Sequence, residues 1–337
     1  MLAARKETVL KIIVGKYIST AVPVASEGIA RSYRLGVSPA TIRLDMAALE
    51  EEGFILRPHH SAGGLPSDKG YRYYVEYLDE PRELALGEQH LIRDLYYQVE
   101  RETREAEEWL RLTAALLRRL SRNVAMVTYP RSPRFQFKRL ELIALRELKA
   151  MLVLVLSQAQ LRQRVLSLDR AVSQEELTAT AHKLNLAYAG QSVRDIARYE
   201  VPLDSLEERV TQLVLKIMEA EERVLGEVYI TGLANLLDQP EFGSRHQLSP
   251  LVEAVETQGW LSGIIPDDEG IRVVIGQENQ VEALRSCSLV LGRYGIPGGI
   301  GGVIGILGPT RMRYGQAISS IRYLKGLLSG LLQEYYA

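Results

Sequence analysis

Residues 36–53 read GVSPATIRLDMAALEEEG, a stretch that carries signals for both ends of one helix. Ser38 can accept a hydrogen bond from the first free backbone N–H groups, and Pro39 suits the first helical position. Gly53 stands where a left-handed residue commonly ends a helix. The sequence therefore predicts a helix that begins after Ser38 and ends before Gly53.

This predicted helix has two different faces. Ile42, Met46 and Leu49 recur at helical spacing and form an apolar face. The side chains of the opposite face are small or uncharged apart from one arginine. This face comprises Ala40, Arg43, Leu44 and Ala47. A helix in the DNA major groove needs small residues and a few base-reading side chains, so this composition favours a recognition helix.

A second helix and a turn precede this helix. We expect Ser26 to cap a short helix over 27–33 and residues 35–37 to form a tight turn. A helix, a turn with glycine and a second helix are typical of a helix-turn-helix, and an ordinary helical hairpin is the alternative. Apolar residues at helical spacing over 6–20 predict a further helix that packs on these two.

The segment that follows has the order of a winged helix. Residues 54–58 predict a strand, residues 59–67 a polar loop and residues 68–78 a helix. Such a loop, or wing, can contact phosphates or the minor groove. His59 and His60 have no further ligand type at metal-binding spacing around them, so we predict wing contact or exposure and no metal site.

Two segments resemble the N-terminal domain of the HrcA family of bacterial heat-inducible transcription repressors: GVSPATIR through LEEEG (36–53), and H-x-SAG-x-x-P-x-DKGYR (59–72). Leu44 departs from the asparagine usual in the family, and Gly64 departs from the usual wing arginine. The resemblance implies a repressor that binds the inverted repeat called CIRCE upstream of chaperone genes. It also implies that the GroEL chaperonin keeps the repressor active and that heat releases it.

Composition places limits on these interpretations. The chain has 337 residues, 46% hydrophobic and 25% charged, which fits two or three soluble globular domains. Its formal net charge is −1, and residues 1–78 hold ten Lys and Arg against eight Asp and Glu, so the DNA-binding prediction rests on the motif. The chain has a single cysteine, Cys287, which excludes an internal disulfide and fits a reducing cytoplasm. We expect neither a signal peptide nor a membrane span.

The middle of the chain predicts a hinge and an α+β unit. Residues 79–81 are a polar break, and residues 84–121 predict one long helix with a solvated charged face; a coiled-coil seam is the alternative. Strands follow, and then two helices. The predicted strands cover 124–129, 137–145, 150–157 and 160–169, and the helices cover 173–189 and 203–224.

From residue 226 onward the chain predicts a second mixed region, with a helix over 250–258, strands over 271–275, 288–294 and 302–307, and a final helix over 314–335. This part also resembles HrcA, which implies a GAF-like fold interrupted by a dimerising insertion. The predicted fold class is multidomain α+β. The predicted domains are a winged helix-turn-helix (1–78), a GAF-like α/β domain (79–134 and 226–337) and an inserted dimerisation domain of a three-stranded sheet plus helices (135–225).

Two glycine-containing segments need separate interpretation. Residues 295–302 lack the endings of a P-loop or a dinucleotide fingerprint, so we predict a hairpin connection. The second segment opens the final helix, and it comprises Gly308, Pro309, Thr310, Arg311 and Met312. A helix start can hold an anion, but the resemblance associates this surface with dimer contacts, and we favour the contact.

No grouping of residues in the sequence indicates catalysis, a metal or a cofactor, so we predict a dimeric DNA-binding repressor. Arg43 is expected to pair with guanine, because arginine can bond O6 and N7 together. The other predicted DNA contacts are thymine methyl contacts by Ala40 and Leu44, phosphate contacts by Ser38, Thr41, Lys69 and Arg72, the helix start at Pro39, and the wing residues His59, His60 and Ser61. The alternatives are a small-molecule-sensing regulator that uses the GAF-like domain, and a protein-interaction module without DNA.

Overall fold

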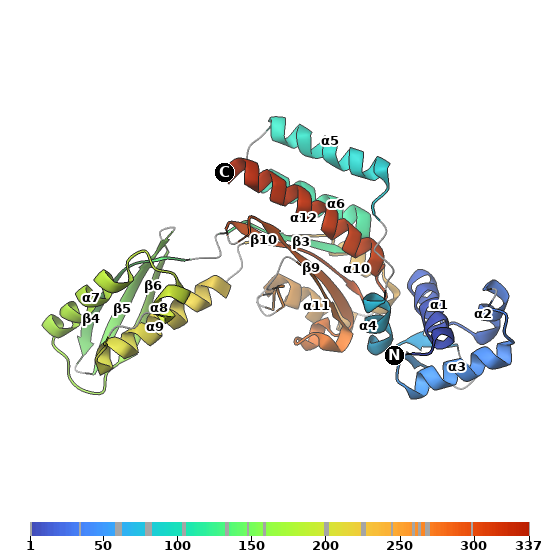
Figure 1. Cartoon of the computed structure of the whole chain (residues 1–337), viewed down its shortest axis with the longest axis horizontal. Coiled ribbons are helices and arrows are strands. Elements are labelled where there is room, and N and C mark those ends of the chain that lie inside the picture. The colour runs from blue at the N-terminus through green and yellow to red at the C-terminus, as the bar shows by residue number, and fades with distance from the viewer. Residues whose placement is uncertain are drawn as a thin grey trace. The chain divides into compact units, whose positions relative to one another are not determined.

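The computed structural model describes residues 2–336 except 34, 58–62, 78–82, 103–105, 132–134, 147, 158–159, 199–201, 224–226, 244, 258–259, 262–263, 267–269 and 298. The chain divides into two compact units (Figure 1). The first unit comprises Met1–Pro130, Gly226–Ile296 and Gly301–Ala337. The second comprises Arg131–Leu225 and Pro297–Ile300, so it is inserted within the first. The predicted hinge at 79–81 lies outside the described residues.

The N-terminal region of the first unit is a small helical domain with a two-stranded sheet. Its elements are α1 (Ala4–Thr20), α2 (Ser26–Ser32), α3 (Pro39–Glu51), β1 (Ile55–Leu56), β2 (Leu65–Pro66) and α4 (Asp68–Glu76). The predicted strand over 54–58 is shorter than expected, because only two of its residues pair with β2. A bridge between Val24 and Gly64 ties the segment before α2 to this sheet. This order of elements is that of a winged helix-turn-helix.

Helix α3 forms as its sequence predicts. The Ser38 side chain accepts a hydrogen bond from the Thr41 backbone N–H at 3.2 Å, and Pro39 occupies the first turn. Gly53 follows the helix with a φ of 78°, a left-handed conformation that favours glycine. The prediction that Ser26 caps α2 is wrong, since the N-cap is Ala25 and Ser26 is the first helical residue.

The rest of the first unit is built on a five-stranded antiparallel sheet. The strands lie in the order β7-β3-β10-β9-β8, and they are β3 (Val124–Thr128), β7 (Val228–Thr231), β8 (Ile271–Ile275), β9 (Cys287–Gly295) and β10 (Gly301–Pro309). Helices α6 (Ala106–Ser121) and α12 (Tyr314–Tyr336) pack on one face of the sheet and on each other. Figure 1 shows α11 (Arg245–Thr257) on the opposite side of the sheet. Shorter helical elements are α10 (Ala234–Leu237), η2 (Pro240–Phe242), η4 (Gly276–Glu278) and η5 (Glu282–Leu284).

Two expectations about helices in this unit are wrong. The predicted helix over 84–121 is two helices, α5 (Leu86–Glu102) and α6, which pack against each other. A buried hydrogen bond between the hydroxyls of Tyr96 and Thr113 joins them, so tertiary packing overrides a continuous helical pattern. Helix α11 begins at Arg245 rather than at Pro250, which lies inside it.

The second unit is a three-stranded meander covered by helices. The strands β4 (Phe137–Arg146), β5 (Lys149–Leu156) and β6 (Leu161–Ser167) are antiparallel in that order. Helices α7 (Gln174–Tyr188) and α9 (Ser205–Arg223) lie near their predicted bounds, and Ser173 caps α7, while α8 (Val193–Ala197) was not predicted. Alternate strand residues such as Leu140, Leu152 and Leu154 form one core with the helices, separate from the core of the first unit.

The glycine-rich segment is a hairpin connection, as predicted. Strands β9 and β10 pair from Gly295 opposite Gly301 to Cys287 opposite Pro309. Of the helices among the described residues, none is long and apolar enough to cross a membrane.

Candidate nucleic-acid interface

The outward face of α3 is exposed as the sequence predicts. Ile42, Met46 and Leu49 are buried, whereas Ala40, Arg43, Leu44 and Ala47 are exposed, with Leu44 at 72%. Ser38 and Pro39 are also exposed, and Thr41 is half-buried. The helix therefore presents small and apolar side chains and one cation to solvent.

Arg43 differs from the other cations of this region. It makes no hydrogen bond or ion pair with any residue that the structure describes. The other described cations up to residue 77 each have an internal partner: Arg5 with Asp45, Lys6 with Glu52, Lys11 with Glu7, Lys16 with Gly28 and Ser32, Arg31 with Glu27, Arg57 with Glu50, Lys69 with Glu52 and Arg72 with Glu278. Arg43 is thus available for an outside partner without loss of an internal contact.

A buried carboxylate fixes how α3 is turned about its axis. Asp45 accepts hydrogen bonds from Arg5 Nε at 2.7 Å and from Arg5 Nη2 at 3.0 Å, and it is 4% exposed. These bonds raise the pKa of the Arg5 guanidinium. Sequence reasoning missed this pair, although an aspartate three positions after Ile42, beside the apolar face, was a signal for it.

Lys69 and Arg72, which the sequence predicts as phosphate contacts, both have partners within the chain. Lys69 Nζ donates to the Glu52 carbonyl oxygen at 2.8 Å and lies 4.4 Å from the ring centre of Phe54, so it caps the end of α3. Arg72 donates through Nε and Nη2 to the Glu278 carboxylate and through Nη2 to the Val273 carbonyl oxygen. Both cations are used inside the chain.

The wing is described only in part. The predicted contacts His59, His60 and Ser61 lie outside the described residues. Gly64 faces the core, because a Cβ built there would lie 3.0 Å from Ile55 Cδ1 and 3.1 Å from Met46 Cε. A position that faces inward would not present a cation to DNA.

The predicted dimer-contact segment lies at the end of β10 and the start of α12. Gly308, Pro309 and Met312 are buried within this chain, and Thr310 is half-buried. Arg311 donates to the carboxylate of Glu241 and, at 2.7 Å, to Gln239 Oε1. The side chains of this segment therefore contribute mainly to internal packing, and only Thr310 and Arg311 keep partial exposure.

A cavity in the first unit is lined in part by Gln239, the residue that binds Arg311. Its volume is about 720 Å³. Its lining combines apolar residues of α5 and α6 with exposed arginines at the end of α6, and it comprises Leu95, Leu112, Ala115, Leu116, Arg118, Arg119, Arg122, Asn235, Asp238 and Gln239. No described residue forms a hydrogen bond or ion pair with the guanidinium groups of Arg118, Arg119 and Arg122.

The fold and the exposed α3 face define a helix-turn-helix DNA-binding protein with a second, mixed α/β region. Residues 32–69 match the DeoR-like helix-turn-helix domain, and residues 107–318 match the HrcA protein C terminal domain. A heat-inducible transcription repressor HrcA of Dehalococcoides mccartyi is 41% identical over 341 residues, which cover 100% of this chain and 97% of the relative. The same-named protein of Roseiflexus castenholzii is 40% identical over 347 residues, with 99% and 96% covered.

The chain therefore belongs to the HrcA family of heat-inducible transcription repressors. It is a repressor and not an enzyme, and the resemblance on which the sequence analysis relied is confirmed. A crystal structure of a hypothetical protein has the same fold, with a TM-score of 0.59, 23% identity and 99% of each chain covered.

Proposed function

We propose that this repressor binds an inverted-repeat operator of the CIRCE type as a homodimer, in the cytoplasm, and that each copy places α3 in a major groove. The observation that carries the proposal is the outward face of α3, where Arg43 is exposed and has no partner among the described residues. An arginine in a recognition helix can bond guanine O6 and N7 together. Ala40 and the 72% exposed Leu44 are suited to thymine methyl groups.

The other DNA contacts that we propose come from the start of α3 and from the wing. Ser38, Pro39 and Thr41 stand at the N-terminus of the helix, where the positive end of the helix dipole attracts phosphate and the two hydroxyls can donate to phosphate oxygens. His59, His60 and Ser61 would add wing contacts. Lys69 and Arg72 are left out, because their side chains already bind Glu52 and Glu278.

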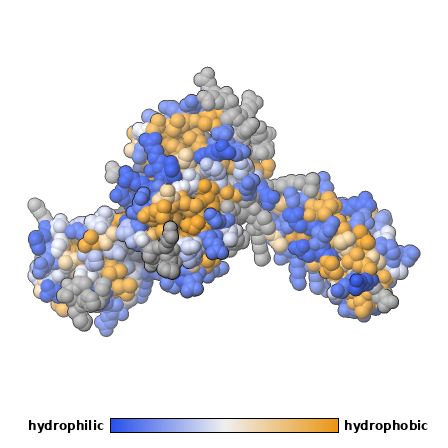
Figure 2. All heavy atoms as spheres, turned by 180° about the vertical axis from the view of Figure 1, so that it is seen from behind, coloured by the Kyte–Doolittle hydropathy of each residue, from blue (hydrophilic) through white to orange (hydrophobic). Residues whose placement is uncertain are grey.

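An exposed apolar sheet face supports the homodimer. In the second unit, Ile143 pairs across the sheet with Met151, and Met151 pairs with Val165, so the three side chains share the face opposite the covering helices. Ile143 is 42% exposed and Val165 is 59% exposed. Figure 2 shows apolar side chains gathered over this unit. An uncovered apolar sheet face is typical of a protein–protein interface, and the inserted unit would thus be the main dimerisation domain, with a GAF-like first unit adding Thr310 and Arg311.

Regulation by heat would act on this dimer. The family's curated relatives are heat-inducible repressors, and we extend that property to this chain together with the GroEL chaperonin as the partner that keeps the repressor active. The proposed role of GroEL is tested by adding purified GroEL to the repressor during a heat challenge and measuring how much DNA binding is recovered. Recovery no greater than with an inert protein at the same concentration would contradict it.

Footprinting of the purified protein tests the DNA part of the proposal. We expect protection of two half-sites in its own upstream region, and stronger binding to the inverted repeat than to one half-site or to a scrambled duplex. Measurements at several salt concentrations separate sequence-specific binding from phosphate attraction, which weakens with salt. Equal affinity for the repeat and the scrambled duplex at every salt concentration would contradict the proposal.

The cavity of about 720 Å³ favours a second candidate, a small-molecule-sensing regulator. Its apolar floor and three arginines would suit a ligand with an apolar body and an anionic group. A ligand that stabilises the folded protein would raise its melting temperature. A screen of carboxylates that changes neither the melting temperature nor the affinity for the operator would exclude this candidate.

A further inference from the structure

Helix α4 joins the DNA-binding region to the five-stranded sheet through polar contacts with η4. Asp68 Oδ2 accepts a hydrogen bond from the Gln277 backbone N–H at 2.8 Å. Arg72 binds both carboxylate oxygens of Glu278, and its Nη2 donates to the Val273 carbonyl oxygen at 2.8 Å. We call these residues, with Gly276, the α4–η4 joint.

The backbone of η4 is shaped to receive Asp68. Gly276 has a φ of 52°, and a Cβ built on it would lie 2.2 Å from Asp68 Oδ2. Any other residue at 276 would displace the carboxylate and adopt a strained conformation. Glu278 is held from its own side as well, since its Oε2 accepts the Ile275 backbone N–H at 2.9 Å. The backbone around η4 therefore holds both carboxylates of the joint, Asp68 and Glu278, in place.

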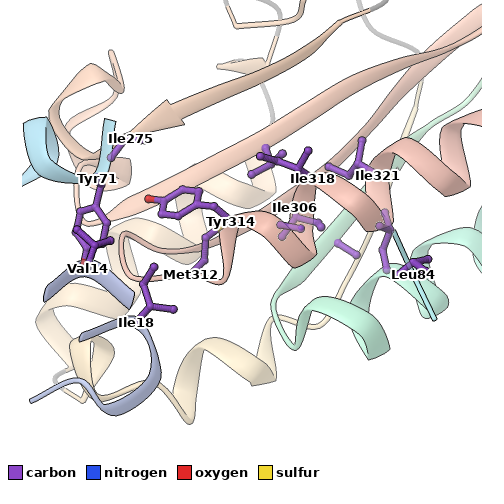
Figure 3. Packing of buried hydrophobic residues seen from close by; sticks show 14 of the residues in the cluster. Val14, Ile18, Tyr71, Leu84, Ile275, Ile306, Met312, Tyr314, Ile318 and Ile321 are labelled. Carbon is purple, nitrogen blue, oxygen red and sulfur yellow. The ribbon is translucent and has the colours of Figure 1, made fainter. Parts of the chain in front are cut away.

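Aromatic and apolar packing continues the joint into the core. The rings of Tyr71 on α4 and Tyr314 on α12 lie with centroids 6.0 Å apart, and burial raises the pKa of both hydroxyls. Tyr314 donates to the Thr310 carbonyl oxygen at 2.6 Å and is 2.8 Å from the Ser288 hydroxyl on β9. Figure 3 shows Tyr71 beside Tyr314, with Val14 of α1 next to Tyr71 and Ile18 of α1 next to Met312.

None of these contacts involves the outward face of α3. The joint residues lie on α4 and η4, whereas Arg43 and Leu44 point to solvent from α3. Helix α4 in turn packs on α1, and α1 packs on α3. Contacts at the joint therefore fix the direction of α3 relative to the sheet without touching DNA.

Fixed direction matters for a dimer on an inverted repeat. The two half-sites must lie on the same side of the duplex, one helical turn or a multiple of it apart. Two linked contacts raise affinity only when the protein can engage both together. We infer that the α4–η4 joint sets the half-site spacing that the repressor accepts, with Asp68, Arg72, Gly276 and Glu278 as positioning residues. This inference rests on the proposed dimeric binding of an inverted repeat.

The test compares spacer dependence in full-length variants. Arg72→Ala and Glu278→Ala are titrated against the native inverted repeat, against repeats whose spacer is changed by a half turn, and against a single half-site. Since the second contact contributes about 10²–10⁴-fold when geometry allows it, the native protein should prefer its natural spacer over the half-turn spacer by about 100-fold. Each variant should reduce that preference to about tenfold or less and bind the half-site as the native protein does.

Two features of the design separate positioning from phosphate binding. If Arg72 bound a phosphate, Glu278→Ala would free the arginine and strengthen binding to every duplex, whereas the joint predicts the same loss of spacer preference from both substitutions. The double variant should lose less spacer preference than the sum of the two single losses, because both substitutions remove the same Arg72–Glu278 pair. Gly276→Ala opens the joint without changing a charge and should act in the same direction.

Arg170→Ala is the matched control, since Arg170 binds both oxygens of Glu176 on the exposed surface of the second unit. It should retain the native spacer preference. Unchanged spacer preference in the joint variants, with unfolding and dimerisation as in the native protein, would overturn the inference. A native protein that prefers no repeat over a half-site would overturn the proposed function first, and the inference with it.

Discussion

Arg43 carries the residue-scale prediction for DNA recognition. It is exposed on α3 and has no partner among the described residues, so its removal should leave the fold intact. A lost bidentate contact to guanine costs roughly 1–3 kcal/mol of binding free energy. We expect Arg43→Ala to weaken binding to the operator by that amount and to relax base preference at one position of each half-site, as measured by titration of base-substituted duplexes.

Arg31→Ala is the control for this prediction, because it removes an exposed cation of α2 whose one partner among the described residues is Glu27, at 3.7 Å. It should leave base preference unchanged. If Arg43→Ala weakened operator and random duplexes equally, Arg43 would be a phosphate contact and not a base-reading residue.

Cys287 gives a second residue-scale prediction. Its thiol is buried at the start of β9, and burial raises its pKa to about 12. The thiolate is the reactive form, so the folded protein at pH 8 should react with an alkylating reagent only as fast as it unfolds. In the unfolded chain the thiol titrates near its ordinary value, so raising the pH from about 9 towards 12 should lower the free energy of unfolding.

The measurement for Cys287 is the alkylation rate followed by mass spectrometry, with and without denaturant. Reaction in denaturant serves as the control that the reagent is active. A native rate close to that of the denatured protein would contradict the buried position of the thiol.

Sequence reasoning at the residue scale succeeded where the cause was local. The exposure of Arg43 and the cap at Ser38 follow from helical spacing and from the chemistry of neighbouring residues. The internal partners of Lys69 and Arg72 were not predicted, since the partner of Arg72 lies 206 positions away at Glu278. Nothing in the local pattern distinguishes an arginine that binds phosphate from one that binds a distant carboxylate.

At the element scale, the boundary between α5 and α6 shows how packing overrides a helical pattern. Tyr96 and Thr113 are buried, and their hydroxyls are bonded to each other, while Thr113 Oγ1 donates to the Trp109 carbonyl oxygen at 2.6 Å. The Tyr96 hydroxyl therefore donates to Thr113. The sequence predicted a single helix here because apolar residues at helical spacing occur both before and after residues 103–105. The contact between Tyr96 and Thr113, which shows that two helices pack on each other, is not visible in that pattern.

This hydrogen bond can be tested as a pair. Thr113→Val leaves the buried Tyr96 hydroxyl without a partner and should lower the free energy of unfolding by about 1–3 kcal/mol. Adding Tyr96→Phe removes the unsatisfied group, so the double variant should be less destabilised than Thr113→Val alone. Urea unfolding gives both values.

Thr178→Val is the control for the Thr113 substitution, because Thr178 also bonds a helical carbonyl four residues back but is exposed. Its effect should stay within a few tenths of a kcal/mol, as for most surface substitutions. A double variant as unstable as the sum of the two single ones would contradict the pairing.

At the scale of the whole molecule, the sequence predicted the order of nearly all elements but not how the strands of the five-stranded sheet pair. The strands of the larger sheet come from both sides of the inserted unit, with β3 between β7 and β10. Pairing across so many residues depends on tertiary packing, which local periodicity does not encode. The three-stranded meander, by contrast, joins neighbours in the chain through short connections, and its strands were placed within a few residues.

Val165 carries the prediction for assembly. It is 59% exposed on the sheet face that it shares with its cross-strand neighbours Ile143 and Met151. A charge at this position should therefore not disturb the core on the other side of the sheet. In a dimer that buries this face, however, Val165→Glu would place an unpaired carboxylate in an apolar interface, which is strongly unfavourable. We expect Val165→Glu to be folded and monomeric in analytical ultracentrifugation and to bind one half-site at most.

Leu186→Glu is the matched control, because Leu186 is 74% exposed in the same unit but lies on helix α7. This variant should remain a dimer and protect both half-sites. A Val165→Glu protein that still sediments as a dimer would mean that the sheet face is not the dimer interface, and the contact would then have to be sought on another surface of the chain. If Leu186→Glu also became monomeric, the effect would reflect added charge on the unit rather than loss of one apolar contact.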